Sequence, residues 1–440
     1  MNTVKLDHNR QGYNVRPLLI AIVAALMVLA VLCQLSSQVS ASRGDSEERV
    51  QFEGLVYDLN ETLTLEALID ANFRSQQDRP PRAYAAIKGS IWVWFSLNSL
   101  AAQLDVLELE LAWLDKVEVY FVTEEGTYRS FSAGDEEVFS NRPLAFRYPA
   151  FPLFRELDGV AVKKVVVRVS AQGSFSLPLN AMQTKRFNSK ANSDYLFYGF
   201  WIAVLVALGL YNAVIFFSLR SNVHFYYFFY VCAFGALLIT ASGIGQQYLW
   251  PTERGLTTHL ANLFLALTNS GTALFVIHFL KLSSFSPALS QCLRAFSYFS
   301  LFSLPFVFIY GYAALAPILV SSAAIMLLGF WAALYCSLRG SPVAPFLVAS
   351  LIVLLPCNSI GLLRFAGFFD DAAWTEHLAE LGMAADALIL SVALAFQVNV
   401  LRGDKEAASL ARERERTAFA KRILQAKEQE RRSIGKALHD

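Results

Sequence analysis

A nearly continuous apolar region between residues 195 and 401 constrains this chain more than any other feature of its sequence. Stretches without Asp, Glu, Lys or Arg cover residues 195–219, 223–250, 257–280, 295–338 and 340–363. A last stretch, residues 381–401, contains a single acidic residue, Asp386. About 20 apolar residues suffice for a helix to cross a bilayer. Because 55% of the chain is hydrophobic and only 17% is charged, the sequence predicts a multi-pass membrane protein.

The stretch from residue 295 to residue 338 decides the number of spans. As one helix it would be about 66 Å long, roughly twice the hydrocarbon thickness of a bilayer. It is therefore predicted to form two spans that turn near residues 311–317. With this turn, residues 195–401 are predicted to cross the membrane seven times.

The short loops between these spans indicate the orientation. Basic residues fall on one side, and acidic residues predominate on the other. The first group is Arg220, Lys281, Arg294, Arg339 and Arg402, and the second is Glu253, Arg254, Asp370, Asp371 and Glu376. Because the positive side of a membrane protein faces the cytoplasm, residues 42–190 are predicted to lie outside and residues 402–440 inside.

The first 41 residues have the order of a secretory signal. Lys5, Arg10 and Arg16 precede an apolar stretch at residues 18–32, and Val39-Ser40-Ala41 provides a cleavage site of small residues. The alternative is an uncleaved anchor, because the apolar stretch is only slightly short for a span. All five cysteines fall in apolar stretches, so no disulfide framework is expected outside the membrane.

Residues 42–190 contain segments in which polar and apolar residues alternate. The segments cover residues 92–97, 105–111, 117–122 and 162–169, with glycine-containing turns between them. A period of two in Val- and aromatic-rich segments predicts an antiparallel β-sandwich. Its aromatic residues are interpreted mainly as core, and the alternative is that one or two line a binding face for a sugar or another small ligand. They are Trp92, Trp94, Trp113, Tyr120 and Phe121.

The last residues, 428–440, read EQERRSIGKALHD. A neutral imidazole can attack the γ-phosphate of ATP, and an adjacent carboxylate can orient the ring and accept its proton. His439 and Asp440 have these side chains. The segment resembles the phosphoacceptor box of dimerising histidine kinases, roughly E-R-x-R-I-A-x-E-L-H-D. It departs from that pattern at Ser433, Gly435 and Ala437. The alternative is a chance Leu-His-Asp tripeptide on a solvated helix.

No ATP-binding segment accompanies this box. The stretch at residues 433–436 lacks the upstream glycine and the preceding strand of a phosphate-binding loop. The chain itself is therefore expected to hold no cofactor and no metal. ATP and Mg²⁺ are expected only through a missing or separate catalytic domain, so enzymatic activity stays open. The net charge of +1, without a basic face interleaved with aromatics, argues against a nucleic-acid partner.

Polar residues within or beside the predicted spans are candidates for function, because ionisable groups are costly there. They are Asn212, His259, Asn262, Asn269, His278, Arg364, Glu380 and Asp386. Arg364 is predicted to pair with Glu380 or Asp386 and to distinguish two signalling states. Asn212 and Asn269 are interpreted instead as hydrogen-bonding glue between helices.

Residues 402–440 are predicted to form a signalling helix with a weak coiled-coil repeat. Leu410, Leu424 and Ile434 occupy the core positions of this repeat, whereas Lys427 and Arg431 interrupt it. A weak coiled coil of this kind needs further helices to complete a bundle, which predicts a homodimer.

Short pieces along the chain together resemble the bacterial seven-transmembrane receptors with diverse intracellular signalling modules. In the outer part the pieces include residues 114–120, Gly134-Asp135, Asn141-Arg142-Pro143, residues 151–153 and 177–179, and they suit the second type of extracellular domain. In the apolar region they include Tyr198-Gly199, Tyr211-Asn212, Tyr226-Tyr227, residues 247–251 and Gly382-Met383. The resemblance covers most of residues 50–405.

This resemblance implies a multi-domain membrane protein with a jelly-roll-like outer sandwich, a seven-helix bundle and a cytoplasmic helix. It implies a sensor in the bacterial inner membrane, surrounded by lipid, that binds an unknown small ligand outside, with carbohydrate as one class. Together with the phosphoacceptor box, it predicts the receptor portion of a two-component histidine kinase that phosphorylates a response regulator. The alternative is a non-catalytic receptor whose cytoplasmic helix docks on a separate partner.

Overall fold

The structure, a computed structural model, describes residues 47–73, 83–87, 89–170, 173–310, 315–365 and 378–437, together with residues 20, 27 and 30. The chain divides into two compact units, Met1–Ile389 and Leu390–Asp440. The signal expected in residues 1–41 lies almost wholly outside the described residues, so cleaved signal and uncleaved anchor both remain predictions.

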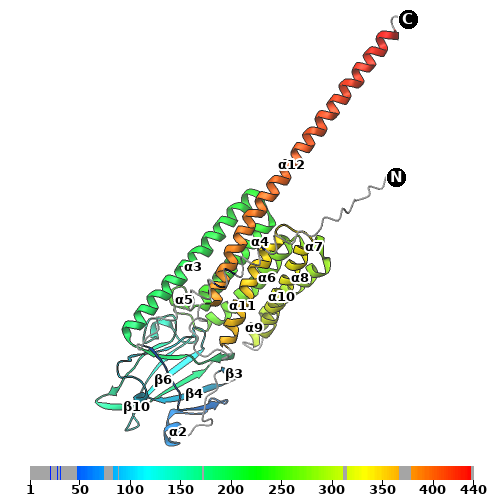
Figure 1. The fold of residues 1–440 in the computed structure, drawn as a ribbon. Coiled ribbons are helices and arrows are strands. Elements are labelled where there is room, and N and C mark those ends of the chain that lie inside the picture. Colours follow the sequence, from blue (N-terminus) through cyan, green and yellow to red (C-terminus); the bar gives the residue numbers. More distant parts are fainter. Residues whose placement is uncertain are drawn as a thin grey trace. The chain divides into compact units, whose positions relative to one another are not determined.

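Antiparallel strands follow one another from residue 47 to residue 182 (Figure 1). One sheet has the order β1-β12-β5-β8, formed by Glu47–Arg49, Leu179–Met182, Val106–Leu109 and Ala150–Pro152. The second has the order β2-β4-β10-β6-β7, formed by Gly54–Asp58, Ser90–Ser96, Val160–Ser170, Lys116–Thr123 and Tyr128–Ala133, with β9 (Glu156–Leu157) paired to β10. A two-stranded sheet joins β11 (Gly173–Ser176) and β3 (Ala83–Ile87). Short 3-10 turns lie at η1 (Leu97–Ser99) and η2 (Phe139–Asn141).

The core lies between the two larger sheets because their strands alternate. Val165, Val167 and Val169 of β10 point into a core that also holds Phe121 and Phe151. The opposite face of the larger sheet is covered by the short helix α2 (Leu65–Asp70), which Thr64 caps by accepting a hydrogen bond from the Ala67 N–H at 3.3 Å. The predicted β-sandwich is confirmed.

Two of the predicted core aromatics lie under α2 rather than between the sheets. Trp92 and Trp94 are buried against Leu65 and Leu68 of this helix. Phe121 is in the central core, and Tyr120 packs half-buried beside Trp92. Trp113, in the turn after residue 111, is 37% exposed. It is the exception among the five aromatics, so the interpretation of most of them as core agrees with the structure.

Long helices follow the sandwich, with short helices between some of them. They are α3 (Thr184–Leu219), α4 (Asn222–Ala241), α5 (Ile244–Tyr248), α6 (Leu256–Phe279), α7 (Leu282–Phe285), α8 (Pro287–Phe302), α9 (Leu304–Tyr310), α10 (Leu315–Leu338), α11 (Ala344–Phe365) and α12 (Leu378–Ala437). Helix α4 packs against both α3 and α6, and α10 packs against α6, α8 and α11. Among the described residues, five helices are long and apolar enough to cross a membrane, namely α3, α4, α6, α10 and the Leu381–Asn399 part of α12.

The remaining two predicted spans correspond to shorter or interrupted helices. The first half of the stretch 295–338 forms α8 and α9, which are separated at Ser303, and α11 contains Pro356. Helix α9 ends at Tyr310 and α10 begins at Leu315. Most of the turn expected near residues 311–317 lies outside the described residues, because residues 311–314 are not described, and residues 315–317 already belong to α10.

Two helix boundaries differ from the apolar pattern. Helix α3 begins at Thr184, so the expected end of the outer domain at residue 190 lies inside this helix. The stretch 223–250 is not one helix, because α4 ends at Ala241 and Gly243 adopts a φ of 81° before α5 begins. A side chain at Gly243 would approach the Arg147 carbonyl oxygen within 2.5 Å. Both differences result from contacts with the sandwich, which hydropathy does not register.

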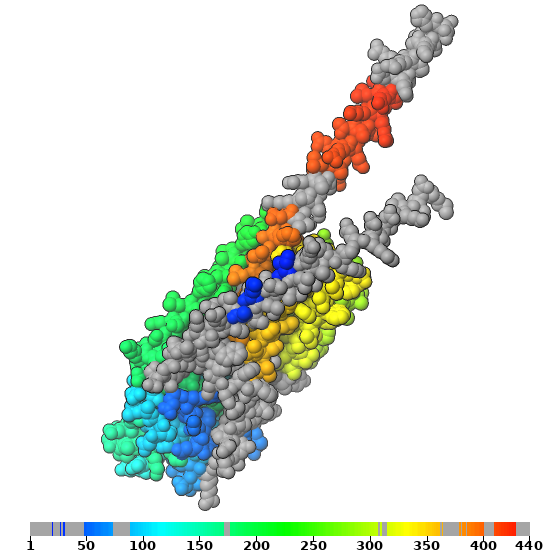
Figure 2. All heavy atoms as spheres, in the orientation of Figure 1, coloured from blue at the N-terminus to red at the C-terminus, as the bar shows by residue number. Residues whose placement is uncertain are grey.

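Helix α12 is continuous for 60 residues, with no break at the expected boundary near residue 402. In the second unit, all side chains from Ser409 to Lys427 are exposed (Figure 2, orange-red). Leu410, Phe419, Ile423 and Leu424 are apolar and at least 51% exposed.

Candidate functional site

A buried ion pair joins the loop before β8 to the first turns of α3. Arg147 Nη2 lies 2.5 Å and Arg147 Nε 3.2 Å from Asp194 Oδ2. The side chains are 1% and 6% exposed, respectively. Arg147 Nη1 also donates to the Ser242 carbonyl at 3.3 Å, just after the end of α4. One guanidinium therefore fixes the ends of two membrane helices to the sandwich.

Aromatic rings surround this guanidinium. The Arg147 Cζ atom lies 3.7 Å from the ring centre of Tyr148 and 4.8 Å from that of Tyr198. Burial raises the pKa of the Tyr148 hydroxyl to about 12, so this ring stays neutral at physiological pH. Cation–π attraction strengthens when the cation is desolvated, and here it adds to the contact with Asp194.

A second set of contacts holds the loop after β7 to α5 and α6. Gln246 is fully buried. Its Oε1 accepts from Arg142 Nη2 at 2.5 Å, and its Nε2 donates to the Gly134 carbonyl at 3.1 Å. Asp135 Oδ2 accepts from the backbone N–H and the hydroxyl of Thr258, each at 3.2 Å. Burial lowers the pKa of Arg142 to about 10, with Asp135 acting in the opposite direction, and the guanidinium stays charged at neutral pH.

A third group of charges connects β5 to α3. Lys190 Nζ lies 2.8 Å from Glu108 Oε2 and also pairs with Glu110. Glu108 is fully buried, and its Oε1 has no hydrogen-bond partner. Residues 106, 108 and 110 are two positions apart, so their side chains point to the same side of the strand. On α3, Phe187, Lys190 and Asp194 have the spacing of residues on one helix face. This side also carries the apolar contacts of Val106 with Phe187.

We call these three groups of contacts the seam. It brings together pieces that sequence comparison within the chain left far apart, among them Gly134-Asp135, Arg142 and the Gln246–Trp250 segment. Sequence reasoning missed Arg147, Asp194, Glu108 and Lys190 as functional candidates. The sequence did contain a sign of these residues. Two acids, Glu108 and Glu110, lie in an alternating segment, and Lys190 and Asp194 come just before an apolar stretch.

Deeper in the apolar region, α4 contacts α12 through polar side chains. The Tyr230 hydroxyl donates to Asp386 Oδ2 at 3.1 Å, and the Tyr227 hydroxyl donates to the Ala387 carbonyl at 2.8 Å. Ser350 of α11 lies near Asp386, and its hydroxyl donates to the Leu347 carbonyl of its own helix at 3.1 Å. Asp386 is 2% exposed. The predicted pairing of Arg364 with Glu380 or Asp386 stays a prediction, because the side chains of Arg364 and Glu380 lie outside the described residues.

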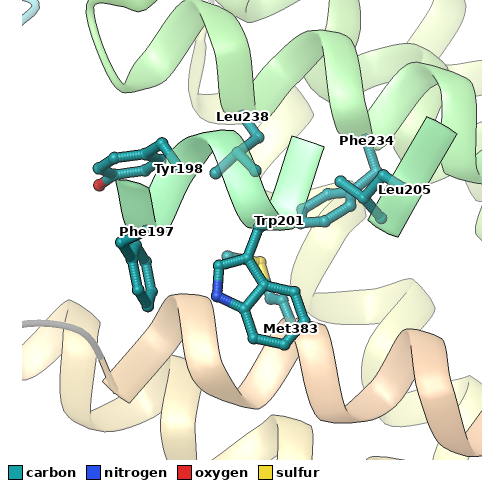
Figure 3. Close-up of a pocket in the computed structure, with 7 residues that line it drawn as sticks. All are labelled: Phe197, Tyr198, Trp201, Leu205, Phe234, Leu238 and Met383. Carbon is teal, nitrogen blue, oxygen red and sulfur yellow. The ribbon is translucent and has the colours of Figure 1, made fainter. Parts of the chain in front are cut away.

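A small apolar pocket lies where α3, α4 and α12 approach one another (Figure 3). It is lined by Phe197, Tyr198, Trp201 and Leu205 of α3, Phe234 and Leu238 of α4, and Met383 of α12. Tyr198 contributes to this wall and also stacks on Arg147. Met383 lies one helical turn before Asp386 in the sequence.

Other polar residues predicted in the spans have local roles. Asn269 Nδ2 donates to the Ser300 hydroxyl and the Ile318 carbonyl at 3.1 and 3.2 Å, so its interpretation as glue between helices is confirmed. Asn212 instead donates to the Leu208 carbonyl of its own helix at 2.9 Å. His278 Nδ1 lies 2.8 Å from the Leu274 carbonyl of α6. In the described ranges, no group of three or more His, Cys, Asp or Glu side chains could hold a metal ion.

His439 and Asp440 lie outside the described residues, so their predicted role remains a prediction. Two comparisons concern the rest of the chain. Residues 194–397 match the family described as 7TM diverse intracellular signalling. Residues 54–183 match the family described as 7TMR-DISM extracellular 2. These matches indicate a seven-transmembrane signalling receptor. In this receptor the seam lies where the extracellular domain meets the membrane helices. The comparison with curated proteins gives no match.

Proposed function

We propose that this receptor is the sensing and phosphoacceptor portion of a two-component histidine kinase in the bacterial inner membrane. A small ligand bound outside, with carbohydrate as one class, biases the seam. The bias passes along α4 to Tyr230 and Asp386, and α12 transmits it to His439. A separate or further catalytic domain supplies ATP and Mg²⁺, and the phosphoryl group then passes to a response regulator.

The continuity of α12 is the observation that carries this proposal. The same helix contains Asp386, which Tyr230 contacts, and runs without interruption to Ala437. His439 follows two residues later. A helix that is hydrogen-bonded throughout transmits a rotation or translation over its whole length. Because phosphoryl transfer depends mainly on positioning and charge stabilisation, a small displacement of His439 is enough to switch the reaction.

The chemistry at the end of the helix needs only these two side chains. His439 attacks the γ-phosphate as neutral imidazole, and Asp440 orients the ring and accepts its proton. The exposed Phe419, Ile423 and Leu424 support pairing of α12 with a second copy. In a homodimer the catalytic domain of one chain can reach the histidine of the other.

Phosphotransfer tests the proposal. Membranes with the full chain are mixed with labelled ATP and the catalytic domain of a related kinase, and acid-labile phosphate on the chain is measured. We expect label on wild type and on His278→Gln, and none on His439→Gln. Equal label on both variants, or none on wild type with an active donor domain, would contradict the role of His439.

The second function is a receptor without catalysis whose helix docks on a partner. The exposed apolar side chains of residues 409–427 favour it as well. Substitution of Phe419 and Ile423 by Ser separates the two. If α12 is a docking helix, the variant loses its signalling output, while the donor domain labels wild type and variant to the same extent or labels neither of them. If the chain is part of a kinase, the phosphate label on the variant falls, because the dimer is weakened.

A further inference from the structure

The carboxyl of Glu108 is a buried acid of the seam with one unsatisfied oxygen. Its side chain is fully buried, yet its Oε1 has no hydrogen-bond partner. Its Oε2 shares the Lys190 ammonium with Glu110. An ionised carboxylate without its own cation is costly in a buried place. Protonation removes this cost and provides an O–H donor.

The surroundings of Glu108 come from five parts of the chain. Lys190 faces it from α3, Glu110 follows it on the same side just after β5, and Arg147 acts on it from the loop before β8. Asp194 of α3 and Tyr148 lie beside Arg147. The cross-strand neighbours are neutral, because Asn180 of β12 and Ala150 of β8 pair with Glu108. Arg147 is engaged by Asp194, so the cation nearest to Glu108 is the shared Lys190.

We propose that Glu108, Glu110 and Lys190 form a proton-binding site between the extracellular sandwich and α3. With the proton bound, Glu108 is neutral, and the Lys190 ammonium faces the charged carboxylate of Glu110. Without it, the carboxylates of Glu108 and Glu110 both approach this ammonium, and their mutual repulsion loosens the contact between β5 and α3. Burial raises the pKa of the Glu108 carboxyl to about 7, although Lys190 acts in the opposite direction, and Glu110 adds to the increase. The site therefore changes its charge near neutral pH.

In the receptor proposed above, the proton is then a signal delivered directly to α3. This consequence rests on the proposed function, whereas proton binding itself does not. Extracellular pH would act at the seam, without a binding face on the outer surface of the sandwich. The test can accordingly be made on the isolated full chain, with no phosphoryl transfer involved.

Infrared difference spectroscopy measures the proton directly. The full chain in lipid nanodiscs is titrated from pH 5 to pH 9, and the carbonyl stretch of protonated carboxylic acids is followed. We expect a band that disappears with a midpoint near pH 7 in wild type and is missing from Glu108→Gln. In Glu110→Gln the midpoint shifts to lower pH, because Lys190 then serves Glu108 alone.

Glu118→Gln is the matched control, since Glu118 belongs to the same domain but pairs on the surface with Arg168. Its band should equal that of wild type. A wild type with no acid band that titrates above pH 6, or a band that survives in Glu108→Gln, would overturn the proposal. If Glu108→Gln does not fold, the wild-type midpoint and the Glu110→Gln shift still decide. Failure of the phosphotransfer assay leaves this result unaffected.

Discussion

The seam and the Asp386 cluster both bury an aspartate, but they satisfy it with different partners. Asp194 meets the guanidinium of Arg147, which carries a permanent charge and several donors in fixed directions. Asp386 accepts a hydrogen bond from the hydroxyl of Tyr230. A guanidinium fixes one geometry between two domains, whereas hydroxyls form single neutral bonds that helices can exchange as they move. We infer that the seam holds the domains together and that the inner cluster permits adjustment.

The largest effect should follow from breaking the seam. Asp194→Asn leaves the Arg147 guanidinium buried without a counter-charge, and we expect a loss of about 3–5 kcal/mol in stability. Unfolding in denaturant, followed by tryptophan fluorescence, measures it. The double variant Arg147→Met with Asp194→Leu removes both charges and should recover most of the loss. If the double variant is as unstable as the single one, packing rather than charge holds the seam.

The next effect is the dependence of stability on pH, which we expect from Glu108 in the seam. The folded pKa of Glu108 is about 7, above its ordinary value near 4.5, so the folded state binds the proton more tightly. The stabilisation from Glu108 is complete below about pH 4.5 and is lost as the pH rises through about 7, with a slope of up to about 1.4 kcal/mol per pH unit.

Melting temperatures of wild type and Glu108→Gln between pH 5 and pH 8.5 measure this slope. Wild type should become less stable across this window, and the variant should show a flatter curve. Parallel curves for the two proteins would mean that another group controls the pH dependence.

A smaller effect is expected at the inner cluster. Tyr230→Phe removes the hydroxyl that Asp386 accepts, and we expect a loss of about 1 kcal/mol, in the range of hydrogen bonds between membrane helices. Tyr226→Phe is the control, because the Tyr226 ring packs against His278 at 4.4 Å, and among the described side chains its hydroxyl makes no hydrogen bond to α12. A loss as large as that of Asp194→Asn would remove the distinction drawn between the two aspartates.

The smallest effect should come from a charge pair outside both regions. Glu118 and Arg168 pair at 3.0 Å on the outer face of β6 and β10, with side chains 17% and 20% exposed. Glu118→Gln should change the stability by less than about 1 kcal/mol, because water screens the pair. Denaturant unfolding under the same conditions provides the comparison. A larger loss would show that burial is not what makes the seam strong.

Sequence reasoning worked where one physical term dominates. Apolar stretches of sufficient length identified the membrane helices, and the alternation in segments such as residues 162–169 identified the sandwich. It failed where distant segments share one contact. Arg147 and Asp194 are 47 positions apart, and Arg142 and Gln246 are 104 apart, so no local pattern links them. The early start of α3 was hidden because its first turns are polar.

The sequence by itself determined that this chain has an outer β-sandwich and a set of membrane helices, because burial of apolar side chains has a period of two in strands and demands long uninterrupted runs in a bilayer. It also determined which side chains are available at the C-terminal end, His439 and Asp440. Only the tertiary structure decided which polar side chains meet. Packing brings together Arg147 with Asp194, Lys190 with Glu108, and Tyr230 with Asp386. The physical reason is that an unpaired buried charge costs more free energy than local secondary-structure preferences can supply.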